Sequence, residues 1–340
     1  MSDTDKPLVL VTMDFSEELM DTLRLSAPQF QFVQHFPDVP DSAWNDAQII
    51  YTARRFPRPE QVPNLKWVQL HSAGIDHMVN ETLFRDRPDV IFTSASGVHV
   101  RHMAQFSLMM ILAFHFKLKR MFEMQQANTW RDDRAVIFAP QDLHLQTVGI
   151  TGYGTIGREV ARLAKGIGMT VLATKRDVMH PAQSPDEYAP PGTGDPTGDL
   201  ADRLYPSEAL ATMARECDYL VNLLPLTEKT RGMINADIFD AMKPTGVLVN
   251  IGRGGVVDEA ALIDALKNGR IGGAALDVFE TEPLPHTSPL WKMENVIISP
   301  HISGNSATYH EKAAELFLAN LKRYHEKKTL YNRVERGRGY

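Results

Sequence analysis

The chain has 340 residues, which is enough for two domains of ordinary size. Its hydrophobic and charged fractions, 43% and 23%, are those of a globular protein, and its net charge of −6 argues against a general nucleic-acid-binding protein. A single cysteine, Cys217, excludes an intrachain disulfide framework. The sequence shows neither a basic and apolar leader nor a run of about 18 apolar residues, so we expect a cytoplasmic protein with no membrane span.

The first hundred residues alternate short apolar runs with turn-like or helix-like segments. Residues 8–13, LVLVTM, predict a buried strand, and Ser16 is suited to cap a helix over residues 16–25. Such alternation favours a parallel α/β sheet. The first hundred residues are therefore expected to form a doubly wound domain, whose further strands cover residues 30–34, 48–52, 66–70 and 90–93.

Residues 100–126 contain neither proline nor glycine and predict one long helix with a wide apolar face, rich in methionine and phenylalanine. A face of this kind packs in a core or a subunit interface much more often than it lines a cofactor site. We interpret this helix as the connector to a second domain and as the surface of a homodimer.

Residues 146–168, QTVGITGYGTIGREVARLAKGIG, predict a strand, a tight turn and a helix. The spacing of Gly152, Gly154 and Gly157 in that context is typical of a site for a dinucleotide pyrophosphate. The glycines allow the turn, the approach of the phosphates and the close packing of the helix, whose N-terminus offers free N–H groups. The alternative is a glycine turn that binds nothing.

The remaining chain continues the alternation, and residues 306–328 predict a last helix that returns to the first domain and makes it discontinuous. Residues 177–206, rich in proline, glycine and aspartate, predict a long surface loop. The basic tail from Arg333 is expected to be poorly ordered. The expected strands are 169–174, 218–224, 246–251, 272–276 and 296–299, and the expected helices are 207–215, 236–241 and 258–267.

Two segments that follow expected strands suit a carboxylate ligand. Arg253 stands between glycines in VNIGRGGVVDE, where packing does not need it, and its planar fork matches a carboxylate. A surface salt bridge is the alternative. In HSAGIDH, successive backbone N–H groups would form a nest for an anion, although a simple turn with Asp76 capping a short helix is an equal alternative. The residues of that nest are Ser72, Ala73 and Gly74.

His301, in VIISPHISG, follows another strand and suits acid–base catalysis, because histidine exchanges protons near neutral pH. Asp277 and Glu282, in AALDVFETEPLP, are the two candidates for a carboxylate that orients its ring. A dinucleotide, an arginine and a carboxylate–histidine pair are what hydride transfer beside a carboxylate requires. The other histidines form no metal-ligand spacing, so no metal is expected.

The end of the second strand after the glycine turn bears on the choice of dinucleotide. An acid that binds ribose is expected about 20 residues past the glycines. In VLATKRD, Thr174, Lys175 and Arg176 stand there instead, and Asp177 lies beyond the expected place. Two cations and a hydroxyl suit a 2′-phosphate, so the sequence favours NADP over NAD. The alternative is that both cations point into solvent.

The motifs HSAGID, GYGTIG, NLLPLTEKT, NIGRGGVVDE, LDVFETEP and SPHISG stand in an order and spacing that resemble the D-isomer-specific 2-hydroxy-acid dehydrogenase family over nearly the whole chain. The resemblance implies an α/β fold of two Rossmann-like, doubly wound parallel-sheet domains with a cleft between them. Residues 1–100 plus 304–340 would form a discontinuous substrate (catalytic) domain. Residues 101–303 would form the dinucleotide-binding domain, which starts with the linking and dimerisation helix.

By motif position, His301, Glu282 and Arg253 correspond to the family's catalytic histidine, the acid paired with it and the substrate-binding arginine. Gln105 stands where members commonly carry glutamate, and the loop over 177–206 exceeds the compact family pattern. The resemblance assigns the substrate carboxylate to Ser72, Ala73 and Gly74.

Asp277 matches a residue near the nicotinamide carboxamide. The complete set of expected cofactor-binding residues is Gly152, Gly154, Thr155, Ile156, Gly157, Thr174, Lys175, Arg176, Leu224, Pro225, Ile251, Gly252, Asp277 and Ser303.

The sequence thus predicts an oxidoreductase that reduces a small 2-keto acid to a D-2-hydroxy acid by reversible hydride transfer from NADPH, with NAD as an alternative cofactor and His301 as acid and base. We expect a homodimer without a nucleic-acid or membrane partner. A dinucleotide-sensing binding protein, similar to a corepressor, is equally compatible with Arg253, Glu282 and His301, but no extra interaction domain is evident. An enzyme for formate or phosphite would need special polar residues near the substrate, and the sequence shows none.

Overall fold

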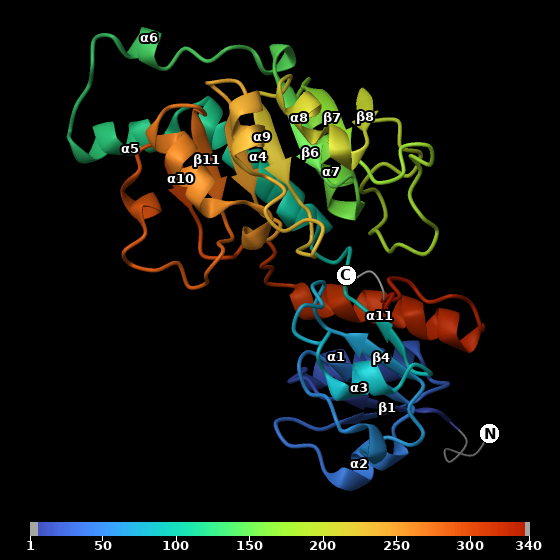
Figure 1. Ribbon diagram of the computed structural model, residues 1–340. Coiled ribbons are helices and arrows are strands. Elements are labelled where there is room, and N and C mark those ends of the chain that lie inside the picture. The colour runs from blue at the N-terminus through green and yellow to red at the C-terminus, as the bar shows by residue number, and fades with distance from the viewer. Residues whose placement is uncertain (1–5, 337–340) are drawn as a thin grey trace. The chain divides into compact units, whose positions relative to one another are not determined.

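The computed structural model describes residues 6–336, which divide into two compact units (Figure 1). The described part of the first unit comprises residues 6–99, 184–190 and 306–336. The second unit comprises residues 100–183 and 191–305. Each unit is built on a parallel sheet, so the predicted fold class is confirmed.

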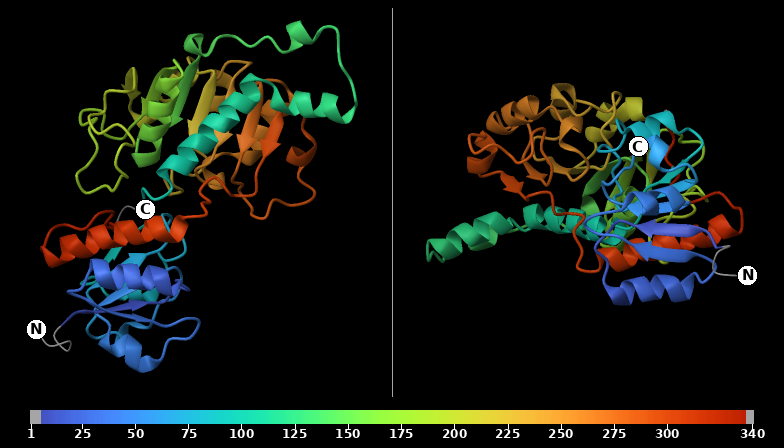
Figure 2. Two further views of the ribbon diagram at one scale, coloured as in Figure 1. Left: turned by 180° about the vertical axis from the view of Figure 1, so that it is seen from behind. Right: turned by 90° about the horizontal axis from the view of Figure 1, so that it is seen from below.

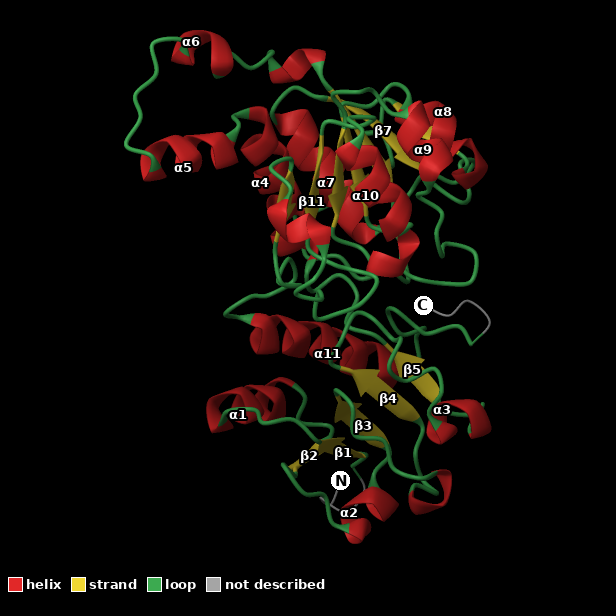
Figure 3. Ribbon diagram, turned by 60° about the vertical axis from the view of Figure 1, so that its left-hand side comes forward, coloured by secondary structure: helices red, strands yellow, loops and turns green. Residues whose placement is uncertain are grey.

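The first unit contains a five-stranded sheet in the order β2-β1-β3-β4-β5, in which all pairs of strands are parallel (Figure 3). Each strand lies within a range that the apolar runs predicted. The strands are β1 (Leu8–Val11), β2 (Gln31–Gln34), β3 (Ile49–Thr52), β4 (Trp67–Leu70) and β5 (Ile91–Thr93).

Helices cover both faces of this sheet because successive strand residues point to opposite sides. Val9 and Val11 pack into the cluster that contains Phe317 of α11, whereas Leu10 packs into the cluster that contains Leu83 of α3. Ser16 caps the first helix, as predicted, by accepting a hydrogen bond from the N–H of Leu19 at 3.3 Å. The helices are α1 (Glu17–Ser26) and α11 (Tyr309–His325) on one face, α2 (Asp41–Asp46) and α3 (Thr82–Asp86) on the other, with the 3₁₀ turn η2 (Pro59–Gln61).

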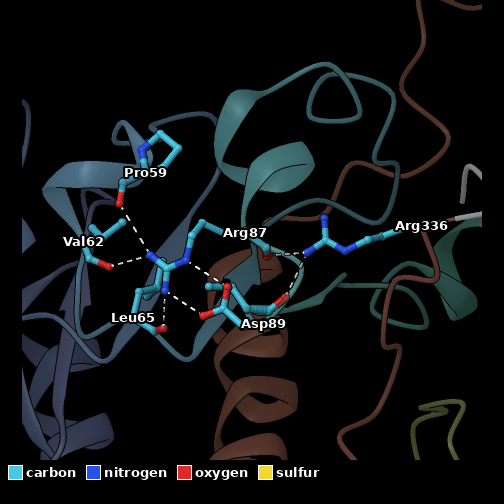
Figure 4. A network of polar contacts seen from close by, with 7 residues as sticks. Pro59, Val62, Leu65, Arg87, Asp89 and Arg336 are labelled. Atoms are coloured by element: carbon cyan, nitrogen blue, oxygen red, sulfur yellow. Dashed lines mark hydrogen bonds and ion pairs between the residues drawn. The ribbon is translucent and has the colours of Figure 1, made fainter.

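The start of the C-terminal tail is anchored, so the expectation of poor order from Arg333 onward is wrong for residues 333–336. Arg336 Nη2 donates to the carbonyls of Arg87 at 2.8 Å and Val90 at 3.2 Å (Figure 4). Its guanidinium also lies over the ring of Phe84, 4.4 Å from the centroid. These contacts depend on the folded unit and leave no local signal in the sequence. Residues 337–340 lie outside the described part of the chain.

The second unit contains a seven-stranded parallel sheet in the order β12-β11-β10-β9-β6-β7-β8. Six of its strands match expected ranges, and β8 is an additional edge strand that lies in the segment predicted as a loop. The strands are β6 (Thr147–Thr151), β7 (Thr170–Thr174), β8 (Arg203–Tyr205), β9 (Tyr219–Asn222), β10 (Val247–Asn250), β11 (Gly273–Leu276) and β12 (Val296–Ile298).

Helices again cover both faces of the sheet. On one face α4 (Val100–His115) lies beside α7 (Thr155–Gly166), and both contribute to one apolar cluster (Figure 2). The second cluster lies on the opposite face and includes residues of the remaining helices. These helices are α8 (Leu210–Ala214), α9 (Ala236–Ala241) and α10 (Glu259–Lys267), with the 3₁₀ turns η4 (Ser207–Ala209), η5 (Gly254–Val256) and η6 (Pro289–Lys292).

The single helix predicted over residues 100–126 is two helices, α4 and α5 (Leu118–Gln126). The break lies at Lys117, whose φ of 53° and ψ of 45° are left-handed and end α4. Such a conformation is costly for lysine but is stabilised here by tertiary contacts. Lys117 Nζ donates to the carbonyl of Ile137, and Lys119 Nζ donates to that of Met293 at 2.7 Å. From α4 the chain continues as an arm through α5, α6 (Arg134–Ile137) and η3 (Leu143–Leu145).

The segment over residues 177–206, predicted as a surface loop, is organised around the buried carboxylate of Asp195. Asp195 accepts hydrogen bonds from the Tyr153 hydroxyl at 2.6 Å and from the N–H of Gly198 at 3.0 Å. Arg158, itself buried, donates to the Asp195 carbonyl at 2.6 Å. Residues 184–190 within this segment belong to the first unit.

Among the described residues, none of the helices combines the length and the apolar character that a membrane span requires.

Candidate active site

The glycine turn between β6 and α7 has the geometry that its sequence predicted. Gly152 has a φ of +98°, which glycine adopts most readily. A Cβ on Gly157 would collide with the carbonyl oxygen of Gly152, so the helix can pack here only with glycine. A Cβ on Gly154, in contrast, would meet no described protein atom within 4 Å. Packing within the chain does not explain that glycine, whereas the approach of a phosphate to the backbone does.

The residues Thr155 and Ile156 form the first turn of α7, which starts at Gly154 without a capping side chain from the described residues. The N–H groups of that turn therefore suit an anion, as the predicted pyrophosphate site requires.

The last residues of six parallel strands lie in register at one edge of the seven-stranded sheet. Every loop that carries a candidate residue of the second unit leaves the sheet from this edge, where parallel α/β folds bind their ligands. The strand-end residues are Thr174, Thr151, Asn222, Asn250, Leu276 and Ile298.

A buried polar chain fixes this edge and was not recognised from the sequence. Thr151 Oγ1 donates to Asn222 Oδ1 at 2.9 Å, and Asn222 Nδ2 donates to Asn250 Oδ1 at 2.9 Å. The same two amide oxygens accept hydrogen bonds from the N–H groups of Leu224 at 3.2 Å and Gly252 at 3.4 Å. An asparagine at the end of each of two apolar runs is the signal that could have revealed it.

This series of hydrogen bonds positions the two loops that carry four of the expected cofactor-binding residues. Leu224 and Pro225 are half-buried, whereas Ile251 and Gly252 are buried. Ile251 packs into the apolar cluster under α4 and α7.

His301 and Glu282 form the central pair of the site. His301 Nδ1 lies 2.7 Å from Glu282 Oε2, and the side chains are 50% and 36% exposed, so the pair is accessible from solvent. Glu282 Oε1 accepts a hydrogen bond from the N–H of Phe279 at 3.0 Å, which fixes the carboxylate. Of the two carboxylates considered, Glu282 is therefore the one that orients the imidazole.

Asp277 instead shapes the loop that carries His301. Its buried carboxylate accepts hydrogen bonds from Ser299 Oγ at 2.7 Å and from the N–H groups of Ile302 and Ser303, both at 2.9 Å. Burial alone would raise the pKa of Asp277, but these hydrogen bonds lower it below its usual value. An ionised Asp277 thus holds the turn in which His301 and Ser303 lie.

Arg253 is half-buried, and its Nη1 donates to the carbonyl of Gly252 at 2.9 Å. Its loop packs directly on the segment that leads to Glu282, because a Cβ on Gly254 would collide with the carbonyl group of Phe279. The structure therefore brings the loops of Arg253, Asp277, Glu282 and His301 to one edge of the second unit.

The segment Ser72–Gly74 follows β4 in the first unit. Ser72 Oγ donates to the carbonyl of Gly74 at 2.8 Å, and the Ser72 carbonyl accepts from the N–H of Ala95 at 2.9 Å. Ser72, Ala73 and Gly74 are all half-buried, so the loop is ordered by its own hydrogen bonds and remains partly accessible.

At the end of β7, Thr174 Oγ1 accepts a hydrogen bond from the N–H of Gly152 at 3.3 Å, which ties this strand end to the glycine turn. Lys175 Nζ donates to the carbonyl of His180, and Arg176 is exposed. Asp177 pairs with His180 at 2.7 Å, and this hydrogen bond lowers the pKa of Asp177. Among the described residues, no group of three or more histidine, cysteine or acidic side chains could hold a metal ion.

Comparison with known proteins identifies the family of the chain. Residues 108–303 match the family model of the D-isomer specific 2-hydroxyacid dehydrogenase, NAD binding domain. A glyoxylate reductase of Thermococcus gammatolerans is 32% identical over 333 residues, which cover 93% of this chain and 92% of that protein.

Two solved structures resemble the whole chain. A D-isomer specific 2-hydroxyacid dehydrogenase of Xanthobacter autotrophicus, in complex with NADPH and MES, has a TM-score of 0.79 and 27% identity over 98% of this chain and 99% of that one. An NADPH-dependent glyoxylate/hydroxypyruvate reductase of Sinorhizobium meliloti, in complex with NADP and sulfate, has a TM-score of 0.76 and 26% identity over 98% and 100% of the two chains. The chain therefore belongs to the D-isomer specific 2-hydroxyacid dehydrogenases, and its second unit is their nicotinamide-dinucleotide-binding domain.

Proposed function

We propose that the chain reduces a 2-keto acid to a D-2-hydroxy acid with NADPH, reversibly, and that His301 is the acid and base of the reaction. The observation that carries this proposal is the 2.7 Å contact between His301 Nδ1 and Glu282 Oε2, at the same edge of the sheet as the dinucleotide-binding turn. A carboxylate on Nδ1 sets the tautomer and orientation of the imidazole, as proton transfer requires.

The residues of the site divide the chemistry among them. A nicotinamide dinucleotide held at the turn of Gly152, Gly154 and Gly157 would supply or accept the hydride at the substrate carbon. His301 donates a proton to the carbonyl oxygen during reduction and removes it from the hydroxyl in the reverse direction. With Nδ1–H donated to Glu282, Nε2 is the nitrogen left for this exchange. Arg253 and the N–H groups of Ser72–Gly74 bind the substrate carboxylate, and Asp277 keeps the His301 loop in place.

We propose that Lys175 and Arg176 make NADPH the preferred cofactor. They follow Thr174, which is hydrogen-bonded to the glycine turn, and the nearby Asp177 is paired with His180. Cations at this strand end suit a 2′-phosphate better than a ribose diol. The Sinorhizobium relative, which is NADPH-dependent, supports this choice.

The test is a panel of 2-keto acids, including glyoxylate, hydroxypyruvate and branched and aromatic acids, with oxidation of NADPH and NADH followed separately. We expect turnover with NADPH and a D-configured product wherever the product is chiral. Changing Lys175 and Arg176 together to alanine should lower kcat/KM for NADPH by about 10- to 100-fold, because charge-assisted hydrogen bonds are lost. Efficiency with NADH should stay nearly constant, and K165A, on the same domain, serves as the control.

If no 2-keto acid of the panel were reduced, the enzymatic proposal would be refuted and a dinucleotide-sensing protein would remain as the alternative. A clear preference for NADH in the unmodified protein would refute the cofactor proposal alone.

We also propose a homodimer formed through the arm that starts in α4 and continues to η3. Helices α5 and α6 bury none of their residues. Large apolar side chains are exposed along the arm, and surface of this kind marks sites of association. Examples are Phe122 at 55%, Trp130 at 82% and Val136 at 80% exposure.

A cytoplasmic location is part of the same proposal. The one cysteine, Cys217, is an unpaired buried thiol, and burial raises its pKa to about 12. A chain without a disulfide is suited to a reducing compartment.

A further inference from the structure

A cluster of polar aromatic side chains in the first unit lies directly before the Ser72–Gly74 loop and has no part in the chemistry described above. Its centre is His71, which follows β4 and is 8% exposed. Around it stand Tyr51 at the end of β3, His99 before α4, and two residues in the first turn of α11, Tyr309 and His310.

Three polar groups of His71 are held by hydrogen bonds. Its N–H donates to the carbonyl of Thr52 at 2.8 Å. Its Nδ1 lies 2.7 Å from the hydroxyl of Tyr51, which is fully buried. Its carbonyl accepts a hydrogen bond from the hydroxyl of Tyr309. The residue that precedes the Ser72–Gly74 loop is thus fixed through both its backbone and its ring.

Ring packing restricts the same residues further. Tyr309 meets the His71 ring edge-on, with centroids 4.8 Å apart and an interplanar angle of 81°. His99 stacks on the Tyr309 ring at 4.7 Å and 16°. Tyr309 therefore contacts two imidazoles, and its hydroxyl has little freedom to leave the His71 carbonyl.

The charge state of His71 supports the same arrangement. Burial, and then the neighbouring His310 and His99, lower the pKa of His71 to about 3. The groups that face it are the Tyr51 and Tyr309 hydroxyls and the His310 and His99 imidazoles. Because His71 stays neutral at physiological pH, protonation does not disturb its contact with Tyr51.

We propose that Tyr309 is a positioning residue which, through the carbonyl of His71, holds the Ser72–Gly74 loop in the conformation that receives the substrate carboxylate. The proposal rests on the proposed function, because it takes that loop to be the carboxylate site. Backbone N–H donors bind an anion well only when they are already in place, and small displacements weaken binding and catalysis. Tyr309 also lies in the helix that follows the His301 loop. One stretch of chain therefore carries both the proposed acid and the residue that holds the Ser72–Gly74 loop.

The test is Y309F, which removes the hydroxyl and keeps the ring in contact with the two imidazoles. We expect KM for the best keto acid and the Kd of oxamate, a carboxylate that is not turned over, to rise about five- to tenfold through the loss of one hydrogen bond. We expect kcat to change less than about twofold and the Kd of NADPH to stay constant, since the cofactor turn is elsewhere. Hydrogen exchange of the amides over residues 71–76 should become faster.

The matched control is Y324F, which removes a hydroxyl from the same helix. The Tyr324 ring stacks on Trp67 at 5.6 Å, so this variant should leave KM, the Kd of oxamate and hydrogen exchange over residues 71–76 at their original values. Circular dichroism confirms that both variants fold.

Unchanged KM, Kd and exchange in Y309F would overturn the proposal, and so would a loss of kcat with constant KM. If the unmodified protein reduced no keto acid, the proposed function would fail. Faster hydrogen exchange over residues 71–76 in Y309F would still establish that Tyr309 holds the Ser72–Gly74 loop. The two failures are therefore distinguishable.

Discussion

His301 combines an unusual backbone with an oriented side chain. Its φ of 53° lies in the left-handed region, and its N–H donates to the carbonyl of Asp277 at 2.9 Å. Histidine and asparagine are among the side chains that adopt this region most readily. The turn directs the imidazole to Glu282, and asparagine can replace the histidine without strain in the backbone.

That property makes H301N the informative variant. We expect kcat to fall by about 10²- to 10⁴-fold, because the proton donor is lost, with the Kd of NADPH nearly unchanged. Steady-state kinetics and fluorescence titration of NADPH measure the two quantities. A normal kcat would remove His301 as the acid, and a weakened cofactor affinity would indicate that the loop itself had changed.

His71 makes stability depend on pH. Its pKa is about 3 in the folded chain and near ~6.5 when unfolded, so only the unfolded state binds the proton between these values. The stabilisation is complete above about pH 6.5 and is lost as the pH falls toward 3, by about 1.4 kcal/mol per pH unit.

Urea unfolding at a series of pH values measures this slope. The variant H71Q should have a flatter slope between pH 6.5 and 4, whereas H286Q, which changes an exposed histidine, should retain the original one. Equal slopes in all three proteins would contradict the assignment.

At the scale of elements, the segment between β7 and β8 behaves as a folded piece, although its composition is that of a loop. Asp195 joins Tyr153, before α7, to the N–H groups of Gly198, Asp199 and Leu200. Burial opposes ionisation of Asp195, but these hydrogen bonds lower its pKa. The Asp195 carboxylate therefore orders this segment through hydrogen bonds.

We expect D195N to lower the free energy of unfolding by about 1–3 kcal/mol, because an acceptor of several buried donors is weakened. Limited proteolysis should then cut faster within residues 177–202, as mass spectrometry of the fragments would reveal. Asp199 is exposed, so D199N is the matched control. Equal cleavage of the two variants would show that Asp195 does not hold the segment.

Regular elements were predictable where the pattern is local. The strands of both sheets, except the edge strand β8, follow from apolar runs. Helices such as α9, over Ala236–Ala241, follow from apolar runs and capping residues. The break at Lys117 was not predictable, because neither glycine nor proline marks it. The side chains of Lys117 and Lys119 at the break instead donate to the carbonyls of Ile137 and Met293, the latter far away in the sequence.

At the scale of the whole molecule, the exposed apolar arm predicts association. We expect light scattering to give the mass of two chains and F122E to give the mass of one, because a buried charge in an apolar interface is unfavourable. L25E is the control, since Leu25 is 81% exposed but lies on α1 of the first unit. A monomeric unmodified protein, or dissociation caused equally by L25E, would contradict the proposed interface.

The sequence by itself determined the family, the class of fold, the dinucleotide turn and the set of candidate residues, because glycine spacing and apolar periodicity act over a few residues. The tertiary structure decided which groups meet. Motif position had already matched Glu282 to the acid that pairs with His301; the structure shows their contact and adds that Asp277 binds the surrounding turn. It also decided that Tyr309 reaches His71 across most of the chain. These contacts join residues that are distant in sequence, so no local pattern could specify them.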